Sequence, residues 1–492
     1  MRSILSKSLT FGAACAVVVV TISLVGSSTA TLFFLLLACF VALSLFYVLS
    51  SGKFELARIF DLPVYVTVIM LLTYGFGPLE VFFDPDRLDP HTPVDESSLV
   101  TALLLVIVGM VAFWTGCKVL EPKHRLRPVI TREQNSRGRI VAVALVMYAV
   151  GFGCKLYLLQ SQLFAYTQSL DVYWDNLADA QLFNFGAQFA TFSLLILGIE
   201  KFSDPSNRLA RWLFWGVFFS ECVWGLISGM KIILLTNFLA VALVSTIQQG
   251  KLARKWLIAT VLGLVIIYPF SNAYRALIRG DYAIEVTDFG AAAQALSLAV
   301  ASGSQTQGSS SDWLQSGSDS TVSRFDTLPT FAMLINMGGK ASEIHGDERL
   351  WMVPFYPFVP RVIWPSKPIL DQAARFSDLL GKGRATATNL PYIGDCYIYA
   401  GLPGIVVGMF VLGLFAQRFT NSLNGVVSKY QVLKYSVLLL TCFWLETGAF
   451  PFWTSLMKTI VALSVIGWAA YGSLKPRTSP VVLRRMPVPQ RA

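Results

Sequence analysis

A stretch of about 120 residues, from Asn272 to Asp395, holds most of the side chains in this chain whose types suggest chemistry. Guanidinium groups form bidentate pairs with phosphate oxygens, and a carboxylate can act as a general base toward a hydroxyl. These types predict a site for a lipid-linked phosphate or pyrophosphate. The charged candidates are Arg275, Arg279, Arg324, Asp326, Arg361, Lys367, Arg384 and Asp395.

One further cation, Lys231, ends the short segment Ser228–Lys231 between two apolar runs. A cation has little structural reason to be in so tight a turn, although snorkelling to the membrane interface would also explain it. Ordinary solvated charge explains a single arginine in the long stretch equally well, and Arg324 and Asp326 could form a local salt bridge. The cluster as a whole favours a binding site.

The composition indicates which elements must position these groups. Apolar residues make up 54% of the 492 residues and charged residues 14%, whereas a soluble domain has about 25% charged residues. Apolar runs long enough to cross roughly 30 Å of hydrocarbon as a helix recur along the chain. The strand-like alternation of a membrane β-barrel is not seen. The sequence therefore predicts an all-α polytopic membrane protein.

Twelve transmembrane helices are expected, with the turn Ser228–Lys231 separating the seventh from the eighth. The first apolar run resembles a cleavable signal peptide. A second apolar run follows at once, which favours a helical hairpin that is retained in the protein. The expected spans are Phe11–Val25, Thr31–Leu49, Pro63–Phe83, Leu99–Val119, Ile140–Leu159, Leu182–Ile199, Leu209–Ile227, Ile232–Ile247, Trp256–Phe270, Cys396–Leu414, Val432–Trp444 and Trp453–Tyr471.

The charges of the loops give an orientation to this scheme. With both termini in the cytoplasm, 25 of the 39 Lys and Arg residues fall in cytoplasmic segments, as the positive-inside rule requires. The short outward loops hold only Arg87, Lys155 and Lys231, and the spans are expected to be nearly free of charge. The net charge of +10 then reflects topology and anionic lipids rather than nucleic acid.

This scheme divides the chain into spans one to nine (1–271), a large outward loop (272–395), spans ten to twelve (396–472) and a cytoplasmic tail (473–492). Within the loop, helices are expected over Gly290–Ala301, Ser323–Met337 and Asp371–Leu380. The segment Ser302–Ser320 is predicted to be a flexible linker. The aromatic and proline-rich Trp351–Pro368 is expected to lie on the membrane surface.

Metal and nucleotide sites are not expected. The seven cysteines lie in or at the ends of spans without metal spacing, and the three histidines fall on different sides of the membrane. Because no Walker loop or dinucleotide fingerprint is present, an ATP-driven pump is disfavoured. No cofactor is predicted.

Several of these residues stand in motifs that resemble the bacterial oligosaccharide repeat-unit polymerases of the Wzy type. The resemblance covers roughly Ser228–Gly404, and its most specific part is Arg361-Val362-Ile363-Trp364-Pro365-Ser366-Lys367-Pro368. Two positions depart from the family pattern: Lys231 stands where arginine is usual, and Asp395 where glutamate is frequent. The other matching segments are Ser228–Lys231, Tyr274-Arg275, Arg324-Phe325-Asp326, Thr386-Ala387-Thr388, Gly394-Asp395-Cys396-Tyr397 and Gly401–Gly404.

The resemblance implies a fold akin to the C-type glycosyltransferases, in the bacterial inner membrane. The reaction would join repeat units linked to undecaprenyl pyrophosphate on the periplasmic face and build a surface polysaccharide or exopolysaccharide. Lys231, Arg275, Arg279, Arg324, Arg361 and Lys367 would bind pyrophosphate, Asp395 or Asp326 would be the base, and Trp364 and Tyr397 would contact substrate. Partners would be lipid-linked oligosaccharides, membrane lipids, a chain-length regulator and the pathway's flippase.

Two other classes remain open. One is another membrane glycosyltransferase or an O-antigen ligase; the acidic turn with Asp84, Asp86 and Asp89 is the feature that a monophosphate-sugar enzyme would show. The other is a flippase for lipid-linked glycans, which is expected to carry charges inside its spans and an internal repeat.

Overall fold

The computed structural model describes most of the chain between residues 29 and 471. The described residues are 29–50, 60–76, 94–122, 129–130, 137–167, 172, 176–204, 206–250, 252–279, 284–305, 327–344, 356, 359, 363–364, 367, 372–381 and 390–471. The first predicted span, Phe11–Val25, and the predicted cytoplasmic tail, 473–492, lie outside this part.

The described chain is helical, apart from a two-residue parallel bridge that pairs Val129–Ile130 (β1) with Val426–Val427 (β2). A π-helical turn, Leu72–Phe76, continues α3, and a 3-10 turn, Cys442–Glu446, follows α17. The helices are α2 (Thr29–Ser50), α3 (Leu62–Leu71), α5 (Glu96–Val119), α6 (Arg137–Gln160), α8 (Leu177–Ser203), α9 (Arg208–Ile227), α10 (Lys231–Gln249), α11 (Arg254–Arg279), α12 (Phe289–Gln305), α14 (Leu328–Asn336), α15 (Gln372–Leu379), α16 (Tyr392–Asn421), α17 (Lys429–Thr441) and α18 (Ala449–Tyr471).

Seven of the described helices are long and apolar enough to cross a membrane, as expected of an all-α polytopic membrane protein. They are α2, α5, α6, α8, α10, α16 and α18. Helices also lie at the other predicted spans within the described part, namely α3, α9, α11 and α17. The count of twelve stays a prediction.

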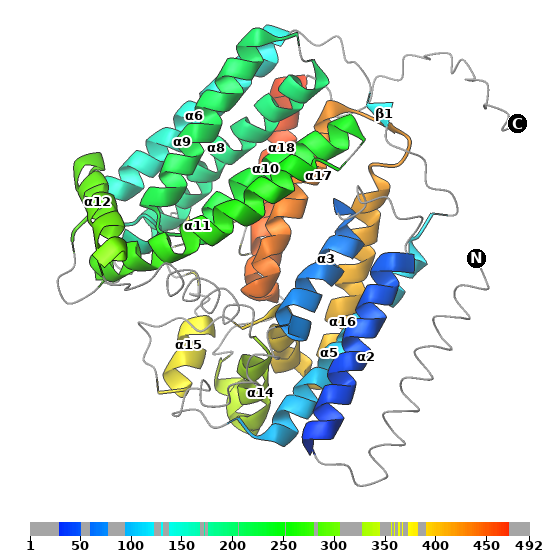
Figure 1. Cartoon of the computed structure of the whole chain (residues 1–492). Coiled ribbons are helices and arrows are strands. Elements are labelled where there is room, and N and C mark those ends of the chain that lie inside the picture. Colours follow the sequence, from blue (N-terminus) through cyan, green and yellow to red (C-terminus); the bar gives the residue numbers. More distant parts are fainter. Residues whose placement is uncertain are drawn as a thin grey trace, which may run out of the picture.

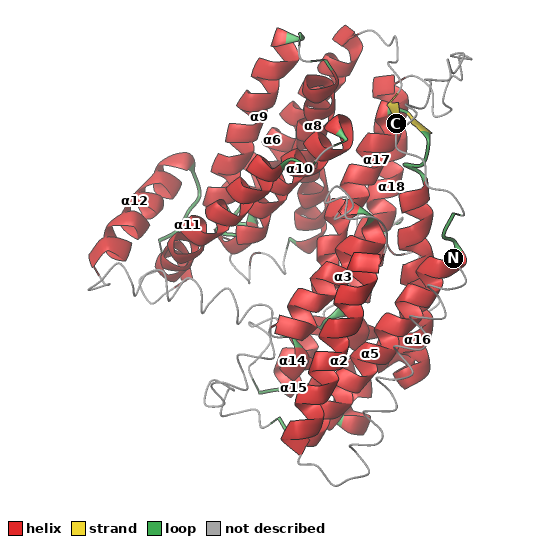
Figure 2. Ribbon diagram, turned by 45° about the vertical axis from the view of Figure 1, so that its right-hand side comes forward, coloured by secondary structure: helices red, strands yellow, loops and turns green. Residues whose placement is uncertain are grey.

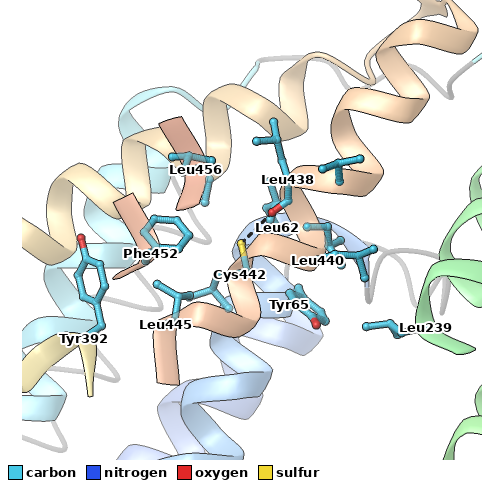
Figure 3. Packing of buried hydrophobic residues seen from close by; sticks show 14 of the residues in the cluster. Leu62, Tyr65, Leu239, Tyr392, Leu438, Leu440, Cys442, Leu445, Phe452 and Leu456 are labelled. Carbon is cyan, nitrogen blue, oxygen red and sulfur yellow. Dashed lines mark hydrogen bonds between the residues drawn. The ribbon is translucent and has the colours of Figure 1, made fainter. Parts of the chain in front are cut away.

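The helices form two groups that α17 and α18 connect (Figure 1). One group contains α2, α3, α5 and α16, and the other contains α6 and α8 to α12, as the turned view also shows (Figure 2). Side chains of α3, α10, α16, α17 and α18 meet between the groups. Figure 3 shows Leu62, Leu239 and Tyr392 around the α17 segment, where the Cys442 thiol donates to the carbonyl of Leu438 at 3.5 Å. The two groups therefore share the larger of two apolar clusters.

Helices α5 and α16 run in parallel and touch backbone to backbone. A Cβ atom built on Gly116 would lie 2.2 Å from the carbonyl oxygen of Phe410, and one on Gly413 would lie 2.1 Å from that of Phe113. Small residues permit such close approach between apolar helices, where van der Waals contact drives association. Chain segments beyond both helices then meet in the β1–β2 bridge.

Gly116→Ala is expected to destabilise the protein, because the added methyl group would clash with the backbone of α16, which cannot move away as a flexible side chain can. A loss of about 1–3 kcal/mol is the usual cost of overpacking. The measurement is the unfolding free energy in detergent. Gly153→Ala in α6 is the matched control, since a Cβ there meets nothing within 4 Å. An equal loss in both variants would contradict the close crossing.

Helix α16 is interrupted at Ala400 and Gly401. Gly401 has φ 60° and ψ −141°, a conformation close to one that essentially only glycine adopts. Beyond it the chain reverses. The hydroxyl of Tyr392 donates to the carbonyl of Gly408 at 3.3 Å, although residues sixteen apart in a straight helix are about 24 Å apart. Residues 392–399 therefore fold back against 402–421 as a helical hairpin, which we call the α16 hairpin.

The α16 hairpin changes the interpretation of the tenth predicted span. The predicted span Cys396–Leu414 contains the reversal, so it is not one straight helix. The segment that can cross the membrane is 402–421. The boundary predicted at 395/396 falls within the short arm of the hairpin, and the boundary at 271/272 falls within α11. The segment Gly401-Leu402-Pro403-Gly404 explains the reversal, because Pro403 lies in the first turn of the second arm, where its missing N–H has no partner to lose.

The described contacts divide the helix ends into two sets. Asn421 donates to the carbonyl of Leu120, Ser203 to Gln248, and Lys429 to Glu200; each contact joins segments predicted on the cytoplasmic side. Ser98 bonds to Asn336, and Gln372 to Tyr399, which joins segments predicted on the outer side. These contacts agree with the alternation of the loops. Which set faces the cytoplasm stays a prediction.

Candidate functional site

The predicted turn at Ser228–Lys231 is present, and it connects α9 to α10. Gly229 has φ 64°, which favours glycine. The Ser228 hydroxyl donates to the carbonyl of Gly225 at 2.7 Å and accepts from the amide of Met230 at 3.0 Å. These local bonds fix the turn, so Lys231 becomes the first residue of α10. We call residues 227–231 the α9–α10 turn.

One face of α11 holds the α9–α10 turn through three side-chain bonds. Ser271 and Arg275 both donate to the carbonyl of Gly229, each at 2.8 Å. The Tyr274 hydroxyl donates to the carbonyl of Ile227 at 2.9 Å. These three residues are spaced for one face of a helix. Their side chains therefore bind the turn together, and the Arg275 guanidinium lies against it.

The α9–α10 turn thus gathers two of the predicted anion-binding cations. Lys231 is 5% exposed and lies at the N-terminus of α10, where the helix dipole favours negative charge. A small cavity beside it has a mainly apolar lining, which consists of Gly225, Leu226, Gly229, Met230, Lys231, Leu234 and Ser271. Arg279, the last residue of α11, comes one turn after Arg275; its side chain lies outside the described part. The turn therefore places two cationic side chains, the type that pairs with phosphate oxygens, at the end of α10.

Asp395 lies in the short arm of the α16 hairpin and is 1% exposed. Its Oδ2 accepts from the amide of Phe450, in the first turn of α18, at 3.3 Å. A Cβ built on Gly448, just before α18, would lie 2.4 Å from the same oxygen. The carboxylate therefore compensates the positive end of α18, a structural role that accompanies any catalytic one.

The predicted base and the predicted pyrophosphate site lie in different apolar clusters. Tyr392 and Cys396, on either side of Asp395, belong to the larger cluster. Tyr274 and Ile278, on either side of Arg275, belong to a second cluster with Trp224. The described structure does not bring these two groups of predicted site residues together.

The remaining described candidates contact other groups of the protein. Lys367 donates to the carbonyls of Tyr356 and Val359, at 2.6 and 3.2 Å, and thereby closes its own turn. Trp364 packs edge-on against Tyr356, with ring centroids 5.6 Å apart. Tyr397 packs edge-on against Phe331 of α14 at 5.8 Å. Three predicted site residues, Arg324, Asp326 and Arg361, lie outside the described residues.

The structure reveals a buried ion pair that sequence reasoning missed. Lys155 of α6 donates to both carboxylate oxygens of Glu221 of α9, at 2.6 and 2.7 Å. Their side chains are 8% and 1% exposed. Lys155 therefore lies within a helix and not in a short outward loop, and the expectation of spans nearly free of charge is wrong for this pair. The sequence contains a signal for this ion pair, since Lys155 and Glu221 are charged residues that each interrupt an apolar run.

Neighbouring contacts connect this ion pair to the α9–α10 turn. The ammonium of Lys155 lies 6.0 Å from the centroid of Trp224, one turn after Glu221. The carbonyl of Trp224 accepts from the amide of Ser228 at 2.9 Å. The Lys155–Glu221 ion pair, the indole of Trp224 and the α9–α10 turn therefore follow one another along the buried face of α9. A second missed pair, Lys429 with Glu200 at 2.8 Å, joins α17 to α8.

Metal ligands do not cluster in the described part of the chain, where no group of three or more His, Cys, Asp or Glu residues could hold an ion. The described cysteines are free thiols: Cys39, Cys117, Cys154, Cys222, Cys396 and Cys442.

A family model described as a domain of unknown function, DUF8712, matches residues 102–445. Because this range is more than half of the 492 residues, the chain belongs to that family. It includes the α9–α10 turn, α11 and the α16 hairpin. Comparisons with curated proteins and with solved structures gave no match.

Proposed function

We propose that this member of the DUF8712 family is a membrane glycosyltransferase that polymerises oligosaccharide repeat units linked to undecaprenyl pyrophosphate, on the periplasmic face of the inner membrane. The observation that carries the proposal is the placement of Arg275 and Lys231 at the α9–α10 turn, at the ends of apolar helices. The motif resemblance between Ser228 and Gly404 supports the same reaction.

The chemistry follows from the leaving group. Undecaprenyl pyrophosphate departs with more negative charge than it carries in the bound donor, so fixed cations stabilise the transition state more than the ground state. Arg275 is held by the carbonyl of Gly229 and needs little reorganisation. Lys231, Arg275 and Arg279 would bind the pyrophosphate of the donor. Arg324, Arg361 and Lys367 are the other proposed pyrophosphate-binding residues, and Trp364 and Tyr397 would contact the substrate.

The acceptor hydroxyl must lose a proton, and Asp326 and Asp395 are the proposed bases. Asp395 also accepts from the α18 amide, so its substitution would disturb the start of α18 as well as any catalysis. Arg275 separates the two effects better, because its side chain can be changed while a donor to Gly229 is kept.

Arg275→Gln is expected to leave single repeat units on the lipid in place of polymer, because glutamine can donate to Gly229 but carries no charge. Arg275→Lys should retain part of the activity, since it keeps charge without the guanidinium fork. The measurement is glycan length in cells that carry only the variant, with membrane abundance recorded.

Tyr274→Phe is the matched control for this experiment. It removes one bond from α11 to the turn and leaves both cations in place, so polymer should persist. Full-length polymer in the Arg275→Gln strain would overturn the charge assignment. Equal loss in Tyr274→Phe would show that α11 serves only to hold the turn.

A second function is favoured by one observation, the ion pair of Lys155 with Glu221 inside two helices. Intramembrane charges mark transport pathways, so a flippase for lipid-linked glycans is the competing proposal. The two differ in the deletion phenotype: loss of a polymerase leaves single lipid-linked repeats that a periplasmic glycosidase can digest in spheroplasts. Loss of a flippase leaves them protected on the cytoplasmic side.

A further inference from the structure

Lys201, in the last turn of α8, has its ammonium enclosed by aromatic rings. Its Nζ lies 3.7 Å from the ring centroid of Trp215, 4.0 Å from that of Phe214 and 4.9 Å from that of Phe202. Contacts with several aromatic faces attract a cation and hold it in place. Trp215 also packs on Trp256 of α11, at 5.7 Å. The ends of α8, α9 and α11 are thus assembled around one oriented cation.

Further cations crowd the same end of the protein. Arg211 and Lys255 act electrostatically on Lys201, and Arg208 and Arg254 begin α9 and α11. A cation in the first turn opposes the helix dipole, and neither helix has an acidic residue there. Helix stability therefore does not explain the cations. We call Lys201, Arg211, Trp215, Arg254, Lys255 and Trp256 the Lys201 patch.

Two carboxylates lie close to Lys201 in the sequence, and both have described partners. Glu200 accepts from Lys429 at 2.8 Å, and Asp204 accepts from the hydroxyl of Ser206 at 2.6 Å. The four cations of the patch outnumber these two carboxylates, of which Glu200 already pairs with Lys429. It lies at the end that collects the segments predicted to face the cytoplasm.

Apolar side chains lie exposed on the same helices, beside these cations. Trp212 of α9 is 76% exposed, and Ile258 and Leu262 of α11 are 58% and 56% exposed. Exposed apolar surface on helices of this length suits contact with acyl chains. Cations at the helix ends with apolar surface next to them match a molecule that has an anionic head and hydrocarbon tails.

We propose that the Lys201 patch binds the headgroup phosphate of an anionic phospholipid, with its acyl chains along α9 and α11. Basic pockets between membrane helices recognise such headgroups through charge, and Lys201 supplies a cation already oriented by its aromatic neighbours. This site is separate from the α9–α10 turn at the other end of α9, and it does not depend on glycan polymerisation.

The test measures lipid retention by the full-length protein in detergent, using native mass spectrometry. Phosphatidylglycerol and phosphatidylcholine with identical chains are added in turn. We expect phosphatidylglycerol to bind with at least tenfold lower Kd. Each cation removed, as in Lys201→Met or Lys255→Met, should raise that Kd about fivefold, because one cation near an anionic surface contributes about that factor.

Two matched variants make the result specific. Lys434→Met removes another cation over a ring at the same end, 5.3 Å from Phe419, and should change the Kd less than twofold. Lys201→Arg keeps the charge and should bind phosphatidylglycerol as the unaltered chain does. Thermal unfolding in detergent checks that Lys201→Met is folded.

Three results would overturn the proposal: equal affinity for both lipids, equal losses in Lys201→Met and Lys434→Met, or full displacement of phosphatidylglycerol by millimolar inorganic phosphate. The last result would assign the patch to a soluble phosphate instead of a lipid.

Discussion

A cysteine introduced by Gly408→Cys is expected to form a disulfide with Cys396. A Cβ built on Gly408 lies 3.4 Å from the Cβ of Cys396 and 2.4 Å from its sulfur, within a few tenths of an ångström of the usual Cβ–Cβ range of about 3.5–4.5 Å. In an uninterrupted helix, residues twelve apart are about 18 Å apart, and no bond could form. The experiment therefore distinguishes the α16 hairpin from a straight tenth span.

The measurement uses a chain in which the other six cysteines are serine, oxidised mildly in membranes. Mass spectrometry of the unreduced peptides should find residues 396 and 408 linked, and maleimide uptake should fall accordingly. Val407→Cys is the matched control, because Val407 is 62% exposed and faces away from the core. Two free thiols in folded Gly408→Cys protein, or equal linkage in both variants, would rule out the hairpin.

Lys155→Met is expected to lower the unfolding free energy by about 3–5 kcal/mol, because it leaves the carboxylate of Glu221 buried without its counter-ion. The double variant Lys155→Met/Glu221→Met removes both charges and should recover most of this loss, since apolar residues often replace a buried ion pair without cost. Denaturant titration in detergent micelles measures both.

An exposed ion pair provides the comparison. Lys118 and Glu121 form a salt bridge at 2.5 Å with side chains 43% and 29% exposed. Lys118→Met should cost no more than about 1 kcal/mol, because solvent screens such pairs. If Lys155→Met costs as little, the burial of Lys155 and Glu221 is not what the structure indicates.

The double variant also bears on function. If the neutral pair folds stably and still produces polymer, the charges of Lys155 and Glu221 serve only to join α6 to α9. Stable folding with glycan trapped on the cytoplasmic side would favour the flippase, whose predicted mark is charge within the spans. Stable folding with single repeats on the periplasmic side would indicate that the pair positions Trp224 and the α9–α10 turn for polymerisation.

The candidate site was predictable from the sequence in part. The types of Lys231 and Arg275 and their positions at the ends of apolar runs predict anion-binding residues, and the structure places both at one turn. The spacing of Ser271, Tyr274 and Arg275 fits one face of α11, although Ser271 is not among the predicted site residues. Their acceptors, the carbonyls of Ile227 and Gly229, could not be predicted, because backbone groups carry no sequence signal about a partner more than forty residues away.

Hydropathy, turn-forming residues and loop charge are local properties, so the sequence by itself determined the helical class, the positions of most helices and the turn at Ser228–Lys231. Only the tertiary structure decided that residues 392–399 reverse against 402–421, that Lys155 meets Glu221, and that Asp395 lies at the start of α18. The physical reason is that these arrangements depend on contacts between distant segments. Gly401 permits a reversal, but packing of Tyr392 and Cys396 against the second arm selects it.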